Sequence, residues 1–162
     1  MPEGIAGSSY QAAVEAAKTF DSVTVIDGKH IAGGIGQVLI GLSEDLDKGM
    51  NSSEIVTDSE RVISSVCGSL ISENPSFLRA GGQLSRNSFN TTRAFGLFPV
   101  IYNKNSRMRV LKMIPGPRHR AWHKYIKNNF KNNSHIDTTL LLVPVVDISF
   151  EDKDYIRSEI EK

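Results

Sequence analysis

Apolar and polar residues alternate along the 162-residue chain with two different periods. Stretches with one apolar face at helical spacing predict helices, and short β-branched or apolar runs predict strands. Helices that separate strands indicate an α/β arrangement with at least partly parallel strands. We predict helices at 10–18, 30–50, 55–65, 86–94, 118–131 and 150–162, and strands at 22–27, 66–71, 97–102, 107–114 and 140–146.

The strand pair near 97–114 departs from this α/β order, because the polar residues 103–106 between the two runs predict a hairpin turn. A hairpin is antiparallel, so it favours an α+β second lobe. We therefore predict a partial first α/β lobe at 1–65 and a partial second α+β lobe at 66–162.

The predicted helix at 30–50 has the clearest apolar stripe. Glu44, Asp45 and Asp47 lie outside it and are expected on the solvent side. The stripe comprises Ile31, Ile35, Val38, Leu39, Leu42 and Leu46.

Composition is that of a globular protein, with 40% apolar and 23% charged residues. No run approaches the ~20 apolar residues of a membrane span, and the first residues lack the basic start and apolar core of a signal peptide. The single cysteine, Cys67, excludes an internal disulfide framework and fits a reducing cytosol. Its small and apolar neighbours predict a packed core thiol.

The charges are segregated along the chain. Residues 74–136 contain twelve Lys or Arg and no Asp or Glu, whereas 1–73 carry eleven acids against four bases, and 137–162 carry seven against three. A net charge of +1 thus conceals a block of +12 between flanks of −7 and −4. Either this basic block faces an anion, or the acidic flanks fold over it and neutralise it.

Two interpretations of the basic segment 101–131 stay open. Its Lys and Arg residues are interleaved with aromatic ones, which favours a nucleic-acid or anion-binding module. Trp122, Tyr125 and Ile126 also have the spacing of a core-facing stripe, which would leave a solvated basic face or a docking face for an acidic partner protein. The pI near 7.9 makes nucleic acid the weaker option.

Candidate cofactor and metal motifs are incomplete. Gly33-Gly34-Ile35-Gly36 lacks the third glycine of a dinucleotide loop, so close helix packing explains it better. His119 and His123 have zinc-ligand spacing, but the basic block offers neither an acid nor a cysteine as a further ligand. We expect no cofactor, no metal and no catalytic residues.

Two glycine-containing turns are the remaining candidates. Gly81 and Gly82 lie between an amphipathic turn and the predicted N-cap Ser85, where a positive φ or a close approach is needed. The turn that leads into Ser8 and Ser9 places hydroxyls and free N–H groups at a helix start. Such a start attracts a carboxylate or phosphate, although a plain N-cap would need only one of the serines.

In order along the chain, four segments resemble motifs of the DegV family. Gly4-Ile-Ala-Gly-Ser-Ser-Tyr-Gln-Ala-Ala13 is similar to its "SGTYQSA" helix start, and Val23-Thr-Val-Ile-Asp27 to its "V-x-V-I-D" strand. Phe77-Leu-Arg-Ala-Gly-Gly-Gln-Leu-Ser85 resembles "yLrkGGRIs", and Leu97-Phe-Pro-Val-Ile101 resembles "lniKPil". The resemblance spans roughly residues 4–130, with glycine at position 7 in place of a hydroxyl residue and Gln83 in place of arginine.

The resemblance implies a cytosolic, two-lobed, non-enzymatic carrier that encloses one long-chain fatty acid between its lobes. A separate kinase subunit would phosphorylate the carboxylate while the carrier holds it. The ligand-binding residues implied are Gly7, Ser8, Ser9, Gly81, Gly82 and Arg118. Family members are longer, so we expect this chain to match the middle of their length and to be a monomer or to pair with itself through open sheet edges.

Overall fold

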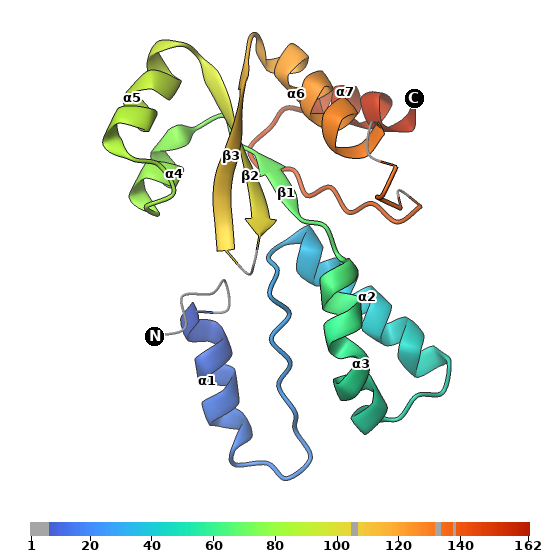
Figure 1. Cartoon of the computed structure of the whole chain (residues 1–162). Helices are drawn as coiled ribbons and strands as arrows, with labels where there is room; N and C mark the ends of the chain where they lie inside the picture. The colour runs from blue at the N-terminus through green and yellow to red at the C-terminus, as the bar shows by residue number, and fades with distance from the viewer. Residues whose placement is uncertain (1–6, 105–106, 132–133, 138) are drawn as a thin grey trace. The chain divides into compact units, whose positions relative to one another are not determined.

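The computed structural model describes residues 7–104, 107–131, 134–137 and 139–162, apart from the side chains of 8, 104 and 131 (Figure 1). Within them it contains seven α-helices, three strands and one π-helical turn. The chain divides into two compact units. Unit 1 comprises the described residues up to Gly68 together with Arg107, and unit 2 comprises 69–104 and the described residues from Met108 onward.

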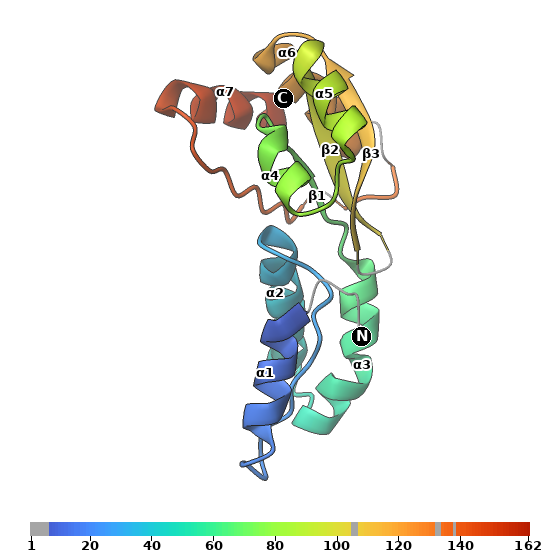
Figure 2. The same cartoon turned by 90° about the vertical axis from the view of Figure 1, so that its left-hand side faces the viewer.

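Unit 1 consists of three helices and a long extended segment. α1 (Gly7–Ala17), α2 (Gly33–Asp47) and α3 (Ser52–Ser65) confirm the three predicted helices. Residues 18–32 connect α1 to α2 through a turn at 18–22 followed by an extended segment (Figure 2). Every described side chain of α1 from 9 to 17 is exposed or half-buried, so the core of unit 1 is formed by α2 and α3.

The start of α3 is fixed by a capping box. The Asn51 side chain accepts hydrogen bonds from the backbone N–H groups of Ser53 and Glu54, and the Glu54 carboxylate accepts one from the Asn51 N–H at 2.7 Å. These bonds satisfy amide groups that have no partner inside the helix. The helix therefore begins at Ser52, three residues before the predicted start at 55.

α2 and α3 pack through small and branched residues. Val38, Val62 and Ile63 are buried between them. A Cβ added at Gly41 would lie only 2.7 Å from Cγ1 of Val62, so glycine permits the close approach of the two helices at this point.

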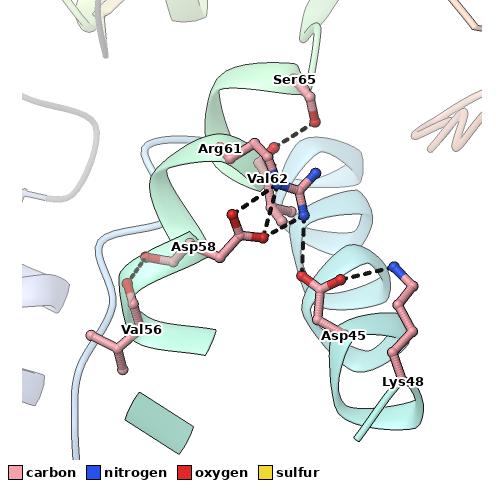
Figure 3. Close-up of polar contacts among 8 residues, drawn as sticks. Asp45, Lys48, Val56, Asp58, Arg61, Val62 and Ser65 are labelled. Carbon is pink, nitrogen blue, oxygen red and sulfur yellow. Dashed lines mark hydrogen bonds and ion pairs between the residues drawn. The ribbon is translucent and has the colours of Figure 1, made fainter. Parts of the chain in front are cut away.

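An ionic cluster joins the same two helices (Figure 3). The Asp45 carboxylate accepts from Nζ of Lys48 at 2.9 Å and from Nη2 of Arg61 at 3.4 Å, and Arg61 also binds Asp58 through its Nε and Nη2. The Asp45 side chain is 3% exposed, so it depends on these partners for its stability in the folded state.

The stripe predicted for α2 is partly wrong. Val38 is buried as expected, but Leu39 and Leu46 are 63% and 57% exposed, and Asp45, expected on the solvent side, is buried. The cause lies on α3: Arg61 draws the Asp45 carboxylate into the interface, which periodicity within one helix does not reveal.

The strand predicted at 22–27 is extended chain without strand pairing. Val23 is 50% exposed, and the described part of unit 1 contains no strand that could accept its ladder. Backbone N–H and C=O groups form a strand only beside a partner. The parallel sheet expected for the first lobe is therefore not confirmed.

Unit 2 is built on a three-stranded sheet of order β1-β2-β3. β1 (Ser69–Ile71) pairs antiparallel with β2 (Leu97–Lys104), with Leu70 opposite Ile101. β2 and β3 (Arg107–Pro115) confirm the predicted hairpin strands. The strand predicted at 66–71 begins three residues later than expected, and Cys67, expected in the core, is exposed before it.

Helices cover both faces of this sheet. α4 (Pro75–Ala80) and α5 (Arg86–Ala94) lie on one side, and α6 (Arg118–Ile126) and α7 (Phe150–Glu161) lie on the other (Figures 1 and 2). The main hydrophobic cluster joins the sheet to α6, with Ile156 and Ile160 of α7 packed against it. Its buried members are Val100, Ile114, Ala121, Tyr125 and Ile126.

Two predictions in unit 2 need correction. The helix predicted to reach 131 changes at Lys127–Lys131 into a π-helical turn. The strand predicted at 140–146 is irregular, and Val146 in it is 84% exposed, because no β-strand among the described residues pairs with this segment. Within the described residues, no helix combines the length and the apolar character that crossing a bilayer requires.

Candidate functional site

The predicted ligand-binding residues are divided between the two units. Gly7, Ser8 and Ser9 belong to unit 1, whereas the other three, Gly81, Gly82 and Arg118, belong to unit 2. Their surroundings are described separately for each unit.

The start of α1 has the features of an anion site. Gly7 is the first residue of this 11-residue helix, and its first turn contains no acidic residue. Ser9 is exposed, and the side chain of Ser8 lies outside the described part of the structure. The first N–H groups of a helix have no intrahelical acceptor, and together with the helix dipole they favour a carboxylate or a phosphate.

The glycine pair forms the turn between α4 and α5. Gly81 caps α4 at φ −80°, and Gly82 follows at φ 74°. The N–H groups of Gln83 and Leu84 both donate to the Leu78 carbonyl, at 2.8 and 3.1 Å. The predicted requirement for a positive φ is thus confirmed at Gly82.

Ser85 then begins α5, as predicted. Its hydroxyl accepts from the Ser88 N–H at 3.1 Å. A Cβ at Gly82 would meet no atom within 4 Å, so the space beside this turn is open.

Arg118, at the start of α6, contacts carboxylates on both sides. Its Nη2 lies 2.9 Å from Glu73, and its Nη1 donates to Asp152 on α7 at 3.0 Å. The guanidinium also lies over the Trp122 ring, 5.6 Å from the centroid. The side chain remains 52% exposed, and a guanidinium has five N–H donors, so part of its hydrogen-bonding capacity faces solvent.

His119 and His123 bind carboxylates of α7 and do not form a metal site. Nε2 of His119 donates to Asp152 at 2.7 Å, and Nδ1 of His123 donates to Glu159, since an ionised carboxylate can only accept. The His119 ring stacks on Tyr155 with centroids 4.2 Å apart. Across the described ranges, no group of three or more His, Cys, Asp or Glu residues is placed to hold a metal ion.

These contacts lower the pKa values of both acids. Hydrogen bonds from Lys162 and from His123 hold the pKa of Glu159 at about 2. The pKa of Asp152 is lowered chiefly by the hydrogen bond from His119. The acidic C-terminal flank therefore neutralises one part of the basic block. This agrees with the second of the two alternatives given above, in which the acidic flanks fold over the block.

Another part of the basic block borders a cavity of about 270 Å³ between the hairpin and α6. Lys112 of β3 and Lys124 of α6 line it, together with Tyr102, Asn128 and Asn129. Sequence reasoning included Tyr102 and both lysines in the basic segment but did not bring them together, and it missed the asparagines. The asparagines lie in the π-helical turn, and no residue pattern had indicated that turn.

Comparisons with known proteins agree on one family. The model of the family described as "uncharacterised protein, DegV family" matches residues 4–147. A DegV domain-containing protein of Caldanaerobacter subterraneus subsp. tengcongensis is 24% identical over 157 residues, which cover 94% of this chain and 56% of the relative.

A solved structure supports the fold. It is that of a DegV family protein from Thermus thermophilus, described for its fatty acid binding, and it matches with a TM-score of 0.59 and 22% identity. The match covers 76% of this chain and 44% of that protein. The chain thus spans about half the length of both proteins.

Proposed function

Because the chain belongs to the DegV family, we propose that it binds a long-chain fatty acid and carries it without transforming it chemically. The observation that carries this proposal is the family match over residues 4–147, which includes both the start of α1 and the glycine turn. The Thermus thermophilus relative, described for fatty acid binding, supports the same ligand class.

The carboxylate is assigned to the start of α1. Ser8 and Ser9 provide the hydroxyl donors there, and the backbone N–H groups around Gly7 provide the others. The first turn of α1 contains no acidic residue, so no carboxylate of that turn competes with the ligand. Hydrogen bonds to a charged acceptor are stronger than neutral ones, so a few donors suffice to orient the head group.

The acyl chain supplies most of the affinity. Each methylene removed from water contributes roughly 0.8 kcal/mol, so a long chain needs only two or three polar contacts for tight binding. In unit 2 we assign Gly81 and Gly82 to contact with the chain, because the space beside Gly82 is open. Arg118 is assigned to the ligand through the N–H donors that its carboxylate partners leave exposed.

Units 1 and 2 are proposed to correspond to parts of the two lobes predicted at 1–65 and 66–162. The expected partner is a cytoplasmic fatty-acid kinase subunit that phosphorylates the bound carboxylate. The exposed basic side chains of residues 107–127 would suit an acidic docking face on such a subunit.

Mass spectrometry of the purified protein, intact under native conditions and after organic extraction, tests ligand binding directly. A stoichiometric mass excess that matches a long-chain carboxylate is the expected result. Added fatty acid should bind with an affinity that is nearly independent of salt, because burial of apolar surface dominates. A protein that neither retains nor takes up fatty acid contradicts the proposal for this chain.

A double variant tests the carboxylate site. Ser8→Ala with Ser9→Ala should weaken fatty-acid binding about tenfold or more, as expected for the loss of hydrogen bonds to a charged group. The matched control is Ser52→Ala with Ser53→Ala, because these are two adjacent exposed serines in the first turn of α3, where Asn51 forms the cap. Equal affinities for the two double variants would remove the assignment to α1.

A further inference from the structure

The cavity in unit 2 is lined by cationic, amide and apolar residues. Its cationic residues are Lys112 of β3 and Lys124 of α6. None of the described residues that line it is acidic. Its volume of about 270 Å³ lies just below the usual range for small-molecule pockets.

The two lysines differ from Arg118 in their partners. Arg118 pairs with Glu73 and Asp152, whereas neither Lys112 nor Lys124 forms an ion pair with any described residue. The Lys112 ammonium lies over the Tyr102 ring, 5.6 Å from the centroid, which directs it along the cavity wall. Two like charges at one cavity repel each other, so a bound anion would stabilise both.

A buried amide lies against the same space. Asn129 is 7% exposed, and its Oδ1 accepts from the Tyr102 hydroxyl at 2.6 Å while its Nδ2 donates to the Tyr125 carbonyl at 2.8 Å. These two bonds fix the orientation of the amide, and Nδ2 carries a second N–H that can serve a ligand. Asn128 and Asn129 both belong to the π-helical turn, a distortion that is frequent at functional sites.

The remaining lining residues are apolar. Val100 and Ile114 are 1% and 6% exposed because they are packed in the hydrophobic cluster of unit 2, so the accessible apolar surface comes from the half-buried Tyr102 ring and the exposed Pro115. An inorganic ion would leave this surface uncovered, whereas an organic anion with a short apolar body would contact it as well as the lysines.

We propose that the cavity between the hairpin, α6 and the π-helical turn binds a small organic anion, with a carboxylate or phosphate head at Lys112 and Lys124 and a short apolar body against Tyr102 and Pro115. This site lies wholly within unit 2 and does not involve Ser8 or Ser9. It is therefore separate from the carboxylate site proposed at α1.

A titration of the ¹⁵N-labelled protein with hexyl phosphate, hexanoate and inorganic phosphate tests this proposal by NMR. Hexyl phosphate or hexanoate should give saturable shifts at the amides of Asn128, Asn129 and Tyr102, and inorganic phosphate should bind at least about tenfold more weakly, because it lacks the apolar body. Whichever of the two six-carbon probes binds more tightly identifies the head group.

Lys112→Gln and Lys124→Gln should each weaken binding of the preferred probe about tenfold or more, since each removes a charged donor. Lys127→Gln is the matched control, because Lys127 is an exposed lysine of the π-helical turn that does not line the cavity, and its affinity should be unchanged. The Ser8→Ala, Ser9→Ala variant should bind the probe like the parent protein, which separates this test from that of the fatty-acid site.

Three results would overturn the proposal. One is the absence of saturable shifts with either six-carbon probe. Another is an equal loss of affinity in all three lysine variants, which would indicate general charge attraction. The third is tighter binding of a single-stranded oligonucleotide at the same lysines, with a steep salt dependence, which would identify an extended nucleic-acid surface.

Discussion

Units 1 and 2 differ in whether their helices and extended segments have partners to pack against or pair with. Unit 2 has a hydrogen-bonded sheet with helices on both faces, and Val100, Ile101 and Ala121 are at most 1% exposed. In unit 1 the buried apolar side chains lie on α2 and α3, whereas α1 and residues 18–32 have none among those described. The extended segment of unit 1 has the β-branched pattern of a strand without the neighbour that a strand needs.

This difference shows how strand formation depends on the distance in sequence between a strand and its partner. The two strands of the unit 2 hairpin are separated by two residues, so each provides the hydrogen-bond partner of the other at little entropic cost. Residues 22–27 and 140–146 have equally clear strand patterns, but their partners would have to come from distant parts of a sheet. The two hairpin strands formed as predicted, and the pattern at 66–71 formed a strand only in its last three residues, where β1 pairs with β2 across the intervening helices α4 and α5. The patterns at 22–27 and 140–146 have no strand partner among the described residues and formed no strand.

The largest effect is expected in the core of unit 2. Ile126→Ala should lower the free energy of unfolding by about 2–5 kcal/mol, because it leaves a cavity in the cluster that joins the sheet to α6. Trp122, the one tryptophan of the chain, reports this transition by fluorescence during urea denaturation. Leu111→Ala on β3 is the control, since Leu111 is 53% exposed and its loss should cost less than about 0.5 kcal/mol. Similar costs for the two variants would mean that this cluster does not stabilise unit 2.

A smaller effect is expected in unit 1. Val62→Ala should destabilise the contact between α2 and α3 by about 1.5–2.5 kcal/mol, because it removes buried methyl groups. Val56→Ala on the same helix is the matched control, with the same change in helix propensity at a side chain that is 38% exposed. Hydrogen exchange of α3 amides measures the difference.

The same experiment tests whether the two units are independent. Val62→Ala should reduce the protection of α3 and leave that of α6 unchanged. An equal loss of protection in α6 would contradict the distinction between the units and show that they unfold as one.

The smallest effect concerns the attachment of α7 to α6 within unit 2. Glu159 has a pKa of about 2 in the folded protein against a usual value of 4.5, so its contribution to stability is fully present above pH 4.5 and is lost as the pH falls toward 2. The lowered pKa of Asp152 acts in the same direction. Hydrogen exchange of α7 should therefore accelerate across this acidic range.

Glu159→Gln should reduce this pH dependence, because the amide does not titrate. Glu161→Gln provides the control, since Glu161 is an exposed acid at the end of the same helix. An undiminished acid transition in Glu159→Gln would show that the pairing with His123 and Lys162 does not hold α7 in place.

The features of the candidate sites can be divided in the same way. Some depend on a few consecutive residues, and others depend on contacts between residues that are far apart in the sequence. The cap at Ser85, the positive φ at Gly82 and the start of α1 depend on a few consecutive residues, and all three were predicted. The carboxylate partners of Arg118 and His119 lie more than 30 residues away in sequence and were not predicted. The anion cavity also depends on residues from two strands, a helix and a π-helical turn.

The amino-acid sequence by itself determined the helices, their caps, the hairpin, the segregation of charge and the resemblance to the DegV family, because propensity, capping and short turns act over a few residues. Tertiary structure alone decided which strand patterns became strands, why Asp45 is buried, and which basic side chains acquired carboxylates. The physical reason is that burial and pairing are properties of two surfaces in contact. The pattern of one segment specifies only its own surface.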